Sequence, residues 1–227
     1  MASEPKHMEL RNVKPLEYSV REAMNTLKTN IYFSGKVKTI SVFSALPWEG
    51  KSIISFNLAR MIAEEGKSVV FVDSDMRKSN FIGRYKPETI GTLYGLTHYL
   101  SGQVDLTDII YMTNIPKLNV ITTGPLTPSP IELINDSRYE EMLQMFARHF
   151  DYVIIDCPPL GSVIDAAAIS SHCDGAVLVI EAGEVSRRHL IDVRDQLEAS
   201  GCRILGAVLN KVDIGKKGYG YYNYYKY

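Results

Sequence analysis

Residues 37–66 read VKTISVFSALPWEGKSIISFNLARMIAEEG, and this stretch decides the fold class of the chain. The apolar run at 37–45 predicts a strand, and residues 53–65 predict a helix that Gly66 ends. A tight turn with the sequence Gly-Lys-Ser joins them. Strand, tight turn and helix in this order form the repeating unit of α/β proteins with parallel sheets.

The same alternation continues along the rest of the chain. Further strands are predicted at 67–73, 118–123, 152–157, 175–182 and 203–210. Further helices are predicted at about 15–34, at 137–149 with Ser137 and Glu140 as a capping box, at 164–171, and from Ser186 to Gly201. Because the strands are continuous apolar runs, we expect an α/β fold with a doubly wound, mostly parallel sheet and helices on both faces. Ligands then bind just after residues 44, 72, 155 and 209, at the carboxyl ends of the strands.

Composition excludes several classes of protein. The chain has 227 residues, of which 45% are hydrophobic and 22% charged, and its formal net charge is -1. This balance gives no sign of a nucleic-acid binder. The three cysteines form no CxxC pair, and the five histidines lack metal-ligand spacing, so neither a disulfide framework nor a zinc site is expected. No apolar run has the length of a membrane span, and the opening residues do not resemble a signal peptide.

Residues 45–52, ALPWEGKS, match the phosphate-binding pattern GxxxxGK[ST] except that Ala45 replaces the first glycine. The segment lies between a predicted strand and a predicted helix, as the pattern requires. Backbone N–H groups would surround a nucleotide phosphate, Lys51 would reach the β and γ oxygens, and Ser52 would bind magnesium. We therefore expect a P-loop NTPase type of fold. The nucleotide-binding residues expected from the loop are Glu49, Gly50, Lys51, Ser52 and Ile53.

Carboxylates follow two more of the predicted strands. Asp73 and Asp75 come after Val72, and Asp156 comes after Ile155. A magnesium ion bound with a nucleotide is held by one or two carboxylates together with phosphate oxygens, so these positions suit such a site. Arg77 and Lys78 could neutralise phosphate charge, and an ordinary place on the solvated surface explains them equally well.

With these motifs the chain resembles the bacterial tyrosine kinases of capsular and exopolysaccharide biosynthesis, called BY-kinases. Residues 45–52 resemble the family's Walker A motif, VVFVDSDMRK at 69–78 its Walker A′ motif, and VIIDCPP at 153–159 its Walker B motif. The segments 28–31, 95–102 and 124–134 resemble connecting segments of the family, and the resemblance spans nearly the whole chain. It implies a kinase domain at 1–213 that transfers the γ-phosphoryl group of ATP to tyrosine with the help of Mg²⁺.

The resemblance also implies roles for particular residues. Lys51 would contact phosphate, Ser52 and Asp73 would belong to the magnesium site, and Asp156 would be a further carboxylate of that site. Asp75 is our candidate for the base that accepts or orients the tyrosine proton. The implied catalytic residues are therefore Lys51, Asp73 and Asp75, and the implied metal residues are Ser52, Asp73 and Asp156.

The last residues of the chain are rich in tyrosine. Residues 214–227 show neither helical nor strand periodicity, and we expect them to form a mobile tail. In the resembled family such tyrosines are autophosphorylation sites. The tail tyrosines are Tyr219, Tyr221, Tyr222, Tyr224, Tyr225 and Tyr227. A tail that binds a partner by aromatic stacking is the alternative.

Two other classes of nucleotide-binding protein remain possible from the sequence. Partitioning ATPases carry a signature lysine five residues before the main lysine, and Leu46 stands at that position here, which argues against that branch. Asn210-Lys211-Val212-Asp213 matches the guanine-reading pattern NKxD of GTPases, although Asn210 could equally contact adenine. A GTPase and a nucleotide-gated scaffold that transfers nothing are therefore kept as alternatives.

The resemblance to Gram-positive-type members, in which the kinase is a separate chain, implies several partners. The first is a transmembrane adaptor related to polysaccharide chain-length regulators, which would activate the kinase and hold it peripherally at the inner face of the plasma membrane, in the cytoplasm. The others are further copies of the chain as a homo-oligomer, a phosphotyrosine phosphatase and other protein substrates, with no nucleic acid. The family's ExxRxxR oligomerisation pattern is reduced here to Glu22, Asn25 and Lys28.

Overall fold

The computed structural model describes residues 6–160 and 168–213. The strands are β1 Lys6–Leu10, β2 Thr39–Ser44, β3 Val69–Asp73, β4 Pro87–Thr89, β5 Tyr111–Thr113, β6 Leu118–Ile121, β7 Tyr152–Asp156, β8 Gly175–Glu181 and β9 Ile204–Asn210. The helices are α1 Tyr18–Phe33, α2 Lys51–Glu64, α3 Phe81–Tyr85, α4 Leu96–Leu100, the 3₁₀ turn η1 Leu106–Asp108, α5 Pro130–Ile134, α6 Ser137–His149 and α8 Arg187–Ala199.

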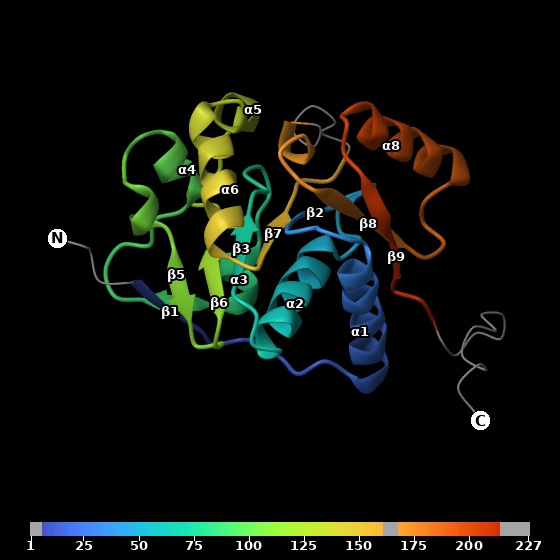
Figure 1. The fold of residues 1–227 in the computed structure, drawn as a ribbon, viewed down its shortest axis with the longest axis horizontal. Helices are drawn as coiled ribbons and strands as arrows, with labels where there is room; N and C mark the ends of the chain where they lie inside the picture. The colour runs from blue at the N-terminus through green and yellow to red at the C-terminus, as the bar shows by residue number, and fades with distance from the viewer. Residues whose placement is uncertain (1–5, 161–167, 214–227) are drawn as a thin grey trace.

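Within the described residues the strands form one nine-stranded sheet in the order β4-β1-β5-β6-β3-β7-β2-β8-β9 (Figure 1). The pairs from β6 through β3, β7, β2 and β8 to β9 are all parallel. Only β1 with β4 and β5 with β6 pair antiparallel among these strands. The predicted α/β fold with a mostly parallel sheet is therefore confirmed.

Helices cover both faces of the sheet, and the strands show why their sequences are continuous apolar runs. On β3, Val70 and Val72 pack into the core under α4, α6 and α8, whereas Val69 and Phe71 pack into the core under α1 and α2. All four of these side chains are at most 1% exposed. A strand buried on both faces needs apolar residues at every position, because its alternate side chains enter different cores.

The sequence did not predict the strands at one end of the sheet, which are β4, β1 and β5. In Figure 1 the chain runs from β1 on the left to α1 on the right before entering the central strands. β1 pairs in parallel with β5 and antiparallel with β4. In β1, Met8 and Leu10 are buried while His7 and Glu9 are exposed, so a period-two pattern is present over only a few residues.

Other boundaries differ by a few residues from the predicted ones. The first helix begins at Tyr18 rather than near residue 15. The capping box of Ser137 and Glu140 is wrong, because Asp136 caps α6 by accepting a hydrogen bond from the Arg138 N–H. The helix predicted from Ser186 is α8, and Ser186 caps it by accepting a hydrogen bond from the His189 N–H. Residues 164–167 of the helix predicted at 164–171 lie outside the described residues, and residues 168–170 are helical.

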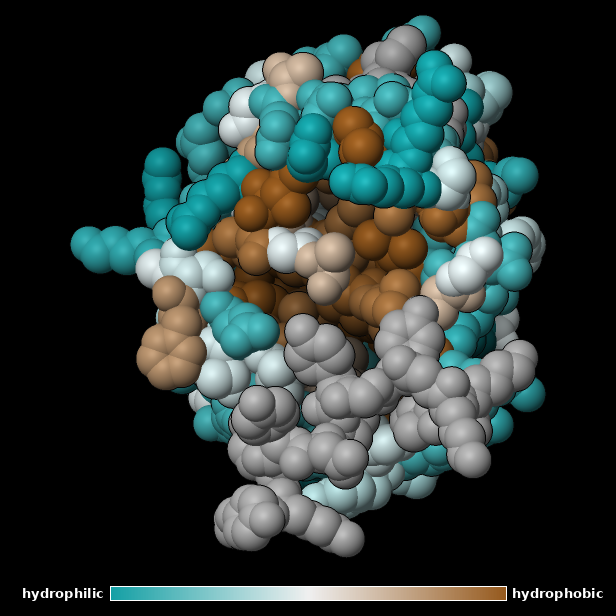
Figure 2. Space-filling view, turned by 90° about the vertical axis from the view of Figure 1, so that its right-hand side faces the viewer, coloured by the Kyte–Doolittle hydropathy of each residue, from teal (hydrophilic) through white to brown (hydrophobic). Residues whose placement is uncertain are grey.

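The other end of the sheet is the edge strand β9. Its residues are half-buried or exposed, and Leu209 is 46% exposed. Figure 2 views the molecule from this end and shows an apolar hollow rimmed by hydrophilic side chains. In the part of the chain that the structure describes, no helix is both long and apolar enough to span a bilayer.

Candidate functional site

The phosphate-binding pattern forms the turn between β2 and α2. Gly50 has φ +92°, a left-handed conformation that favours glycine. A Cβ atom on Gly50 would lie 2.3 Å from Asn210 Nδ2, so glycine is required here for space as well. Ala45, which replaces the first glycine of the pattern, is fully buried in the core. The substitution is accommodated because its methyl group packs inward rather than toward the turn.

Glu49 ties this turn to the ends of two neighbouring strands. Its side chain is 1% exposed, and its carboxylate accepts hydrogen bonds from the backbone N–H of Leu46 at 2.6 Å and of Glu181 at 2.9 Å. Asn210 Nδ2 donates to the Glu49 backbone oxygen at 2.7 Å. The predicted site residues Glu49 and Asn210 are therefore in contact, and the side chain of each forms hydrogen bonds with the protein backbone.

Three predicted aspartates gather around Lys51 at the carboxyl edge of the sheet. Lys51 Nζ lies 3.0 Å from Asp75 Oδ2 and 3.4 Å from Asp156 Oδ1. Asp73 and Asp156 are register partners at the ends of β3 and β7. Each of these four side chains is less than a tenth exposed. The sheet thus brings residues from three separate sequence motifs into one buried charged cluster.

Burial and mutual repulsion change the protonation of this cluster. Burial opposes ionisation of Asp73, and the nearby charge of Asp156 adds to the effect, so the pKa of Asp73 is raised to about 7. Burial also raises the pKa of Asp156, although Lys51 and a hydrogen bond from Ser52 oppose the rise. Burial disfavours the charged form of Lys51, but Asp156 and Asp75 outweigh it and raise the pKa of the ammonium.

The donor set suits a magnesium ion held together with a nucleotide. Among residues 6–160 and 168–213, no group of three or more His, Cys, Asp and Glu side chains is placed to hold a metal. Buried carboxylates with raised pKa values at Asp73 and Asp156, next to the Ser52 hydroxyl, are hard oxygen ligands whose ionised form a cation would favour. The remaining ligands of such an ion would come from phosphate and water.

The other predicted residues are not part of the buried cluster around Lys51. Ile53 is 40% exposed on the first turn of α2, and its N–H already donates to the Gly50 oxygen at 3.0 Å. Arg77 and Lys78 are exposed beside the cluster. Lys28 is buried and its ammonium contacts the Glu65 carboxylate, so it is engaged within its own chain. The six tail tyrosines lie outside the described residues.

Ser79 and Thr123 hold Asp73 in place, and the sequence suggested neither of them. The Ser79 hydroxyl donates to Asp73 Oδ2, and Thr123 Oγ1 donates to the Asp73 backbone oxygen at 2.9 Å. Thr123 comes just after β6, and the predicted strand at 118–123 ended at this residue. The rule that ligands bind beyond the carboxyl ends of strands would have found it, had it been applied to that strand as well.

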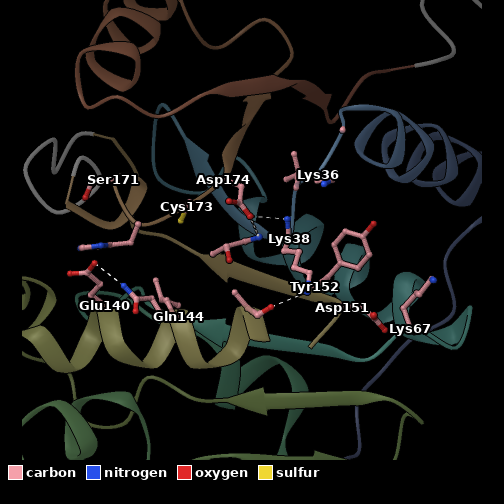
Figure 3. A pocket seen from close by; sticks show the side chains of 16 residues that line it. Lys36, Lys38, Lys67, Glu140, Gln144, Asp151, Tyr152, Ser171, Cys173 and Asp174 are labelled. Carbon is pink, nitrogen blue, oxygen red and sulfur yellow. Dashed lines mark hydrogen bonds between the residues drawn. The ribbon is translucent and has the colours of Figure 1, made fainter. Parts of the chain in front are cut away.

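A cavity of about 750 Å³ lies at the opposite, amino-terminal edge of the strands, far from this cluster along the sheet (Figure 3). Two of its carboxylates accept hydrogen bonds from the backbone, and the third, Glu140, accepts from the Gln144 side chain at 3.0 Å. Asp174 accepts from the N–H groups of Lys38 and Thr39, each at 2.8 Å, and Asp151 accepts from the Ser68 N–H at 2.8 Å. These groups are already satisfied, so the cavity does not compete with the Lys51 cluster as the functional site.

Comparisons with known proteins place this geometry in a family. A family model described as an AAA domain matches residues 37–198. Tyrosine-protein kinase CpsD of Streptococcus agalactiae is 42% identical over 217 residues, which cover 95% of this chain and 92% of that protein. Tyrosine-protein kinase CpsD of Streptococcus pneumoniae is 40% identical over 215 residues, with 93% and 94% covered.

Solved structures agree with the sequence relatives. The kinase domain of the Escherichia coli tyrosine kinase ETK superposes with a TM-score of 0.78 at 30% identity, covering 88% of this chain and 80% of that one. This chain therefore belongs to the bacterial tyrosine kinases of P-loop type, the BY-kinase family.

Proposed function

We propose that the chain is an ATP-dependent tyrosine autokinase that phosphorylates the tyrosine cluster at its own C-terminus and regulates capsular or exopolysaccharide synthesis and export. In this proposal residues 1–213 form the kinase domain and residues 214–227 the substrate tail. The observation that carries it is the buried contact of Lys51 with Asp75 and Asp156 at the end of the P-loop. Such a cluster supplies what phosphoryl transfer needs, which is alignment and charge neutralisation.

The proposed roles follow from the chemistry of each side chain. Lys51 would exchange its carboxylate partners for the β and γ oxygens of ATP, and N–H groups of the loop from Glu49 to Ser52 would bind the phosphates. Bound Mg²⁺ would neutralise the charge that builds up on the phosphate oxygens. Asp73, Asp156 and Ser52 would hold that ion. Asp75 would accept or orient the proton of the attacking phenol.

Asn210 is proposed to lie beside the adenine base. It ends β9, and one of its amide hydrogens is engaged by the Glu49 backbone oxygen, which leaves Oδ1 to accept a hydrogen bond from an exocyclic amine. Lys211 pairs with Glu181 at 2.7 Å. A GTPase would use Asn210 and Asp213 to read guanine, so the two nucleotides must be compared directly.

We propose that transfer occurs between molecules. The unmodified tail carries Lys216, Lys217 and Lys226, so it is attracted to an acidic cluster. Each phosphotyrosine adds about -1.5 to -2 charges, which would expel the product tail by repulsion. The short connection from the end of β9 to the first tail tyrosine favours delivery to a neighbouring subunit of a homo-oligomer rather than back to the chain's own site.

The proposed activator is the cytoplasmic segment of a transmembrane adaptor, which would place the kinase at the inner face of the plasma membrane. The apolar hollow at the β9 end supports a docked partner, since exposed apolar surfaces of this kind mark interaction sites (Figure 2). Half-buried Leu205 and Val208 and exposed Leu209 lie on this edge strand. A phosphotyrosine phosphatase would reverse the modification, and other cellular proteins could serve as further substrates.

One assay separates this proposal from its alternatives. The chain is incubated with Mg-ATP or Mg-GTP, with and without an adaptor peptide, and the tail is analysed by mass spectrometry beside a Lys51→Met control. Phosphotyrosine with ATP alone among the nucleotides supports the proposal. GTP hydrolysis without phosphotyrosine selects the GTPase. ATP binding without phosphotyrosine under any condition selects the nucleotide-gated scaffold.

A further inference from the structure

A small cavity of about 170 Å³ lies next to the aspartate cluster, between the start of α3 and the loop that follows β6. Ser79, Asn80 and Ile82 line one side, and Thr123 and Leu126 line the other. Pockets that hold a whole small-molecule ligand usually measure about 300–1,000 Å³. This cavity is therefore too small for a nucleotide and large enough for one side chain.

This cavity lies at one end of the row of site residues that follow the carboxyl ends of the strands. Asn210 ends β9, the P-loop follows β2, Asp156 ends β7, Asp73 ends β3, and the lining residue Thr123 follows β6. In the sheet these strands stand in the order β9, β8, β2, β7, β3, β6. A nucleotide whose base lies near Asn210 and whose phosphates lie on the P-loop therefore points its γ-phosphate toward β3 and β6.

In-line phosphoryl transfer requires the attacking oxygen to approach opposite the leaving oxygen. Because the leaving ADP lies toward β9, the attacking group must come from the side of β3 and β6. We propose that this cavity is the acceptor subsite, which takes the phenol ring of the tyrosine to be phosphorylated. The inference rests on the proposed function and adds to it the place where the acceptor binds.

The walls of the cavity suit an aromatic ring. Ile82 is 50% exposed and Leu126 is 55% exposed, so both present apolar surface that no other part of the described chain covers. A ring between them would bury apolar area on both of its faces. Thr123, Ser79 and Asn80 supply polar groups at the side nearer to Asp73.

Hydrogen bonds fix both walls to the aspartate cluster. The Ser79 hydroxyl contacts the Asp73 carboxylate, and Thr123 Oγ1 lies 2.9 Å from the Asp73 backbone oxygen. The Thr127 N–H donates to the Met76 oxygen at 3.0 Å, which links the loop of Leu126 to the segment just after Asp75. A ring held in the cavity is thereby held in a fixed position relative to both catalytic aspartates.

The chemical step served by this subsite is a substitution at phosphorus. The bond from the tyrosine oxygen to the γ-phosphorus forms as the bond from that phosphorus to the bridging oxygen of ADP breaks. The phenol proton passes to a carboxylate such as Asp75 or to water. The cavity takes no part in bond making, so Ile82 and Leu126 are positioning residues.

The test uses the full-length chain with Mg²⁺ and a non-hydrolysable ATP analogue. A fluorescent peptide with the sequence of residues 218–227 is titrated with wild type, with Ile82→Ala/Leu126→Ala, and with the control Met145→Ala/Ile191→Ala, whose side chains are 46% and 39% exposed on α6 and α8. We expect the wall variant to bind the peptide about tenfold more weakly. The control is expected to match wild type, and all three proteins to bind the analogue equally.

Equal peptide affinity in wild type and the wall variant would overturn the subsite, as would binding no stronger than that of a peptide with alanine at every tyrosine. Repeating the experiment with Mg-ATP separates the two proposals. If phosphotyrosine forms and the KM for the peptide is unchanged by the wall variant, the subsite is wrong and the kinase function stands. If the walls bind the peptide and no phosphotyrosine forms, the kinase function is wrong and the tyrosine site stands.

Discussion

Asp73 and Asp156 are register partners on the parallel strands β3 and β7, and both carboxyl groups are almost fully buried. Asp156 also lies 3.4 Å from Lys51 Nζ, which holds Asp75 at 3.0 Å. The strand register and the P-loop thus bring these four side chains together. Binding a triphosphate would then be an exchange of partners for Lys51 rather than the assembly of a new site.

Lys51→Met is expected to abolish phosphoryl transfer and also to destabilise the fold. Removing the ammonium leaves Asp75 and Asp156 buried without their cation, and breaking a buried pair in this way costs about 3–5 kcal/mol. For a chain of this size each kcal/mol corresponds to about 2–4 °C in Tm. Circular dichroism melting and a phosphotyrosine assay measure the two effects.

The matched control is Lys78→Met, which removes an exposed cation beside the same cluster. We expect its Tm to stay within about 2 °C of wild type, as for most surface substitutions. An unchanged Tm for Lys51→Met would show that the buried pairs contribute little to stability. If that variant phosphorylates tyrosine at the wild-type rate, Lys51 is not required for phosphoryl transfer.

The raised pKa of Asp73 predicts a stability cost at high pH. Its folded pKa is about 7, against about 3.9 in an unfolded chain, so the folded state binds the proton more tightly. This contribution to stability is fully present below about pH 4 and is lost as the pH rises toward 7. Asp73→Asn is therefore expected to raise the Tm of the magnesium-free protein by several degrees more at pH 8 than at pH 5.

Melting curves in EDTA at several pH values check this expectation, with the exposed Asp192→Asn as the control. The control should shift the Tm equally at every pH. A gain from Asp73→Asn that does not depend on pH would mean that Asp73 is already ionised in the folded chain at pH 5. The same variant should have lost kinase activity if the carboxylate serves the magnesium site.

Glu49→Gln is expected to raise the KM for ATP about tenfold with a smaller change in kcat. The carboxylate accepts from the N–H groups of Leu46 and Glu181, and an amide offers only one oxygen for these two donors. The turn would then lose its fixed shape before the nucleotide binds. Steady-state kinetics with Glu184→Gln, an exposed neighbour, as the control measure the effect. A lowered Tm with an unchanged KM would limit Glu49 to a structural role.

Transfer between molecules is tested by mixing two defective chains. One carries Lys51→Met and an intact tail, and the other is active but ends at Asp213. We expect phosphotyrosine on the tail of the Lys51→Met chain. A mixture in which both chains carry Lys51→Met is the control for contaminating kinases. An unmodified tail in the first mixture would contradict transfer between molecules.

The sequence predicted the centre of the fold and the candidate site because both depend on short segments. The P-loop is read from residues 45–52, and apolar runs ending in Asp73 and Asp156 mark two further strand ends. Once the strands are taken as parallel, their ends must share one edge of the sheet. The meeting of Lys51, Asp75 and Asp156 follows from this geometry without any knowledge of distances.

The remaining features depend on contacts between distant segments. β1 is stabilised by pairing with β5, about a hundred residues later, so its alternation of Met8 and Leu10 was too short to stand out. The Glu49 carboxylate accepts from the backbone N–H of Glu181, and the cavity between Ile82 and Leu126 has one wall in a loop whose Thr127 N–H donates to the Met76 oxygen just after Asp75. No pattern within a single segment of the sequence predicts any of these contacts.

A crystal structure with Mg²⁺ and a non-hydrolysable ATP analogue tests the central claim most directly. We expect Lys51 Nζ to have moved from Asp75 and Asp156 to the β and γ oxygens, with the ion about 2.0–2.1 Å from Ser52 Oγ and linked to Asp73 and Asp156. The terminal phosphate should face the cavity between Ile82 and Leu126. A nucleotide bound elsewhere, with Lys51 still paired to Asp75, would contradict the account.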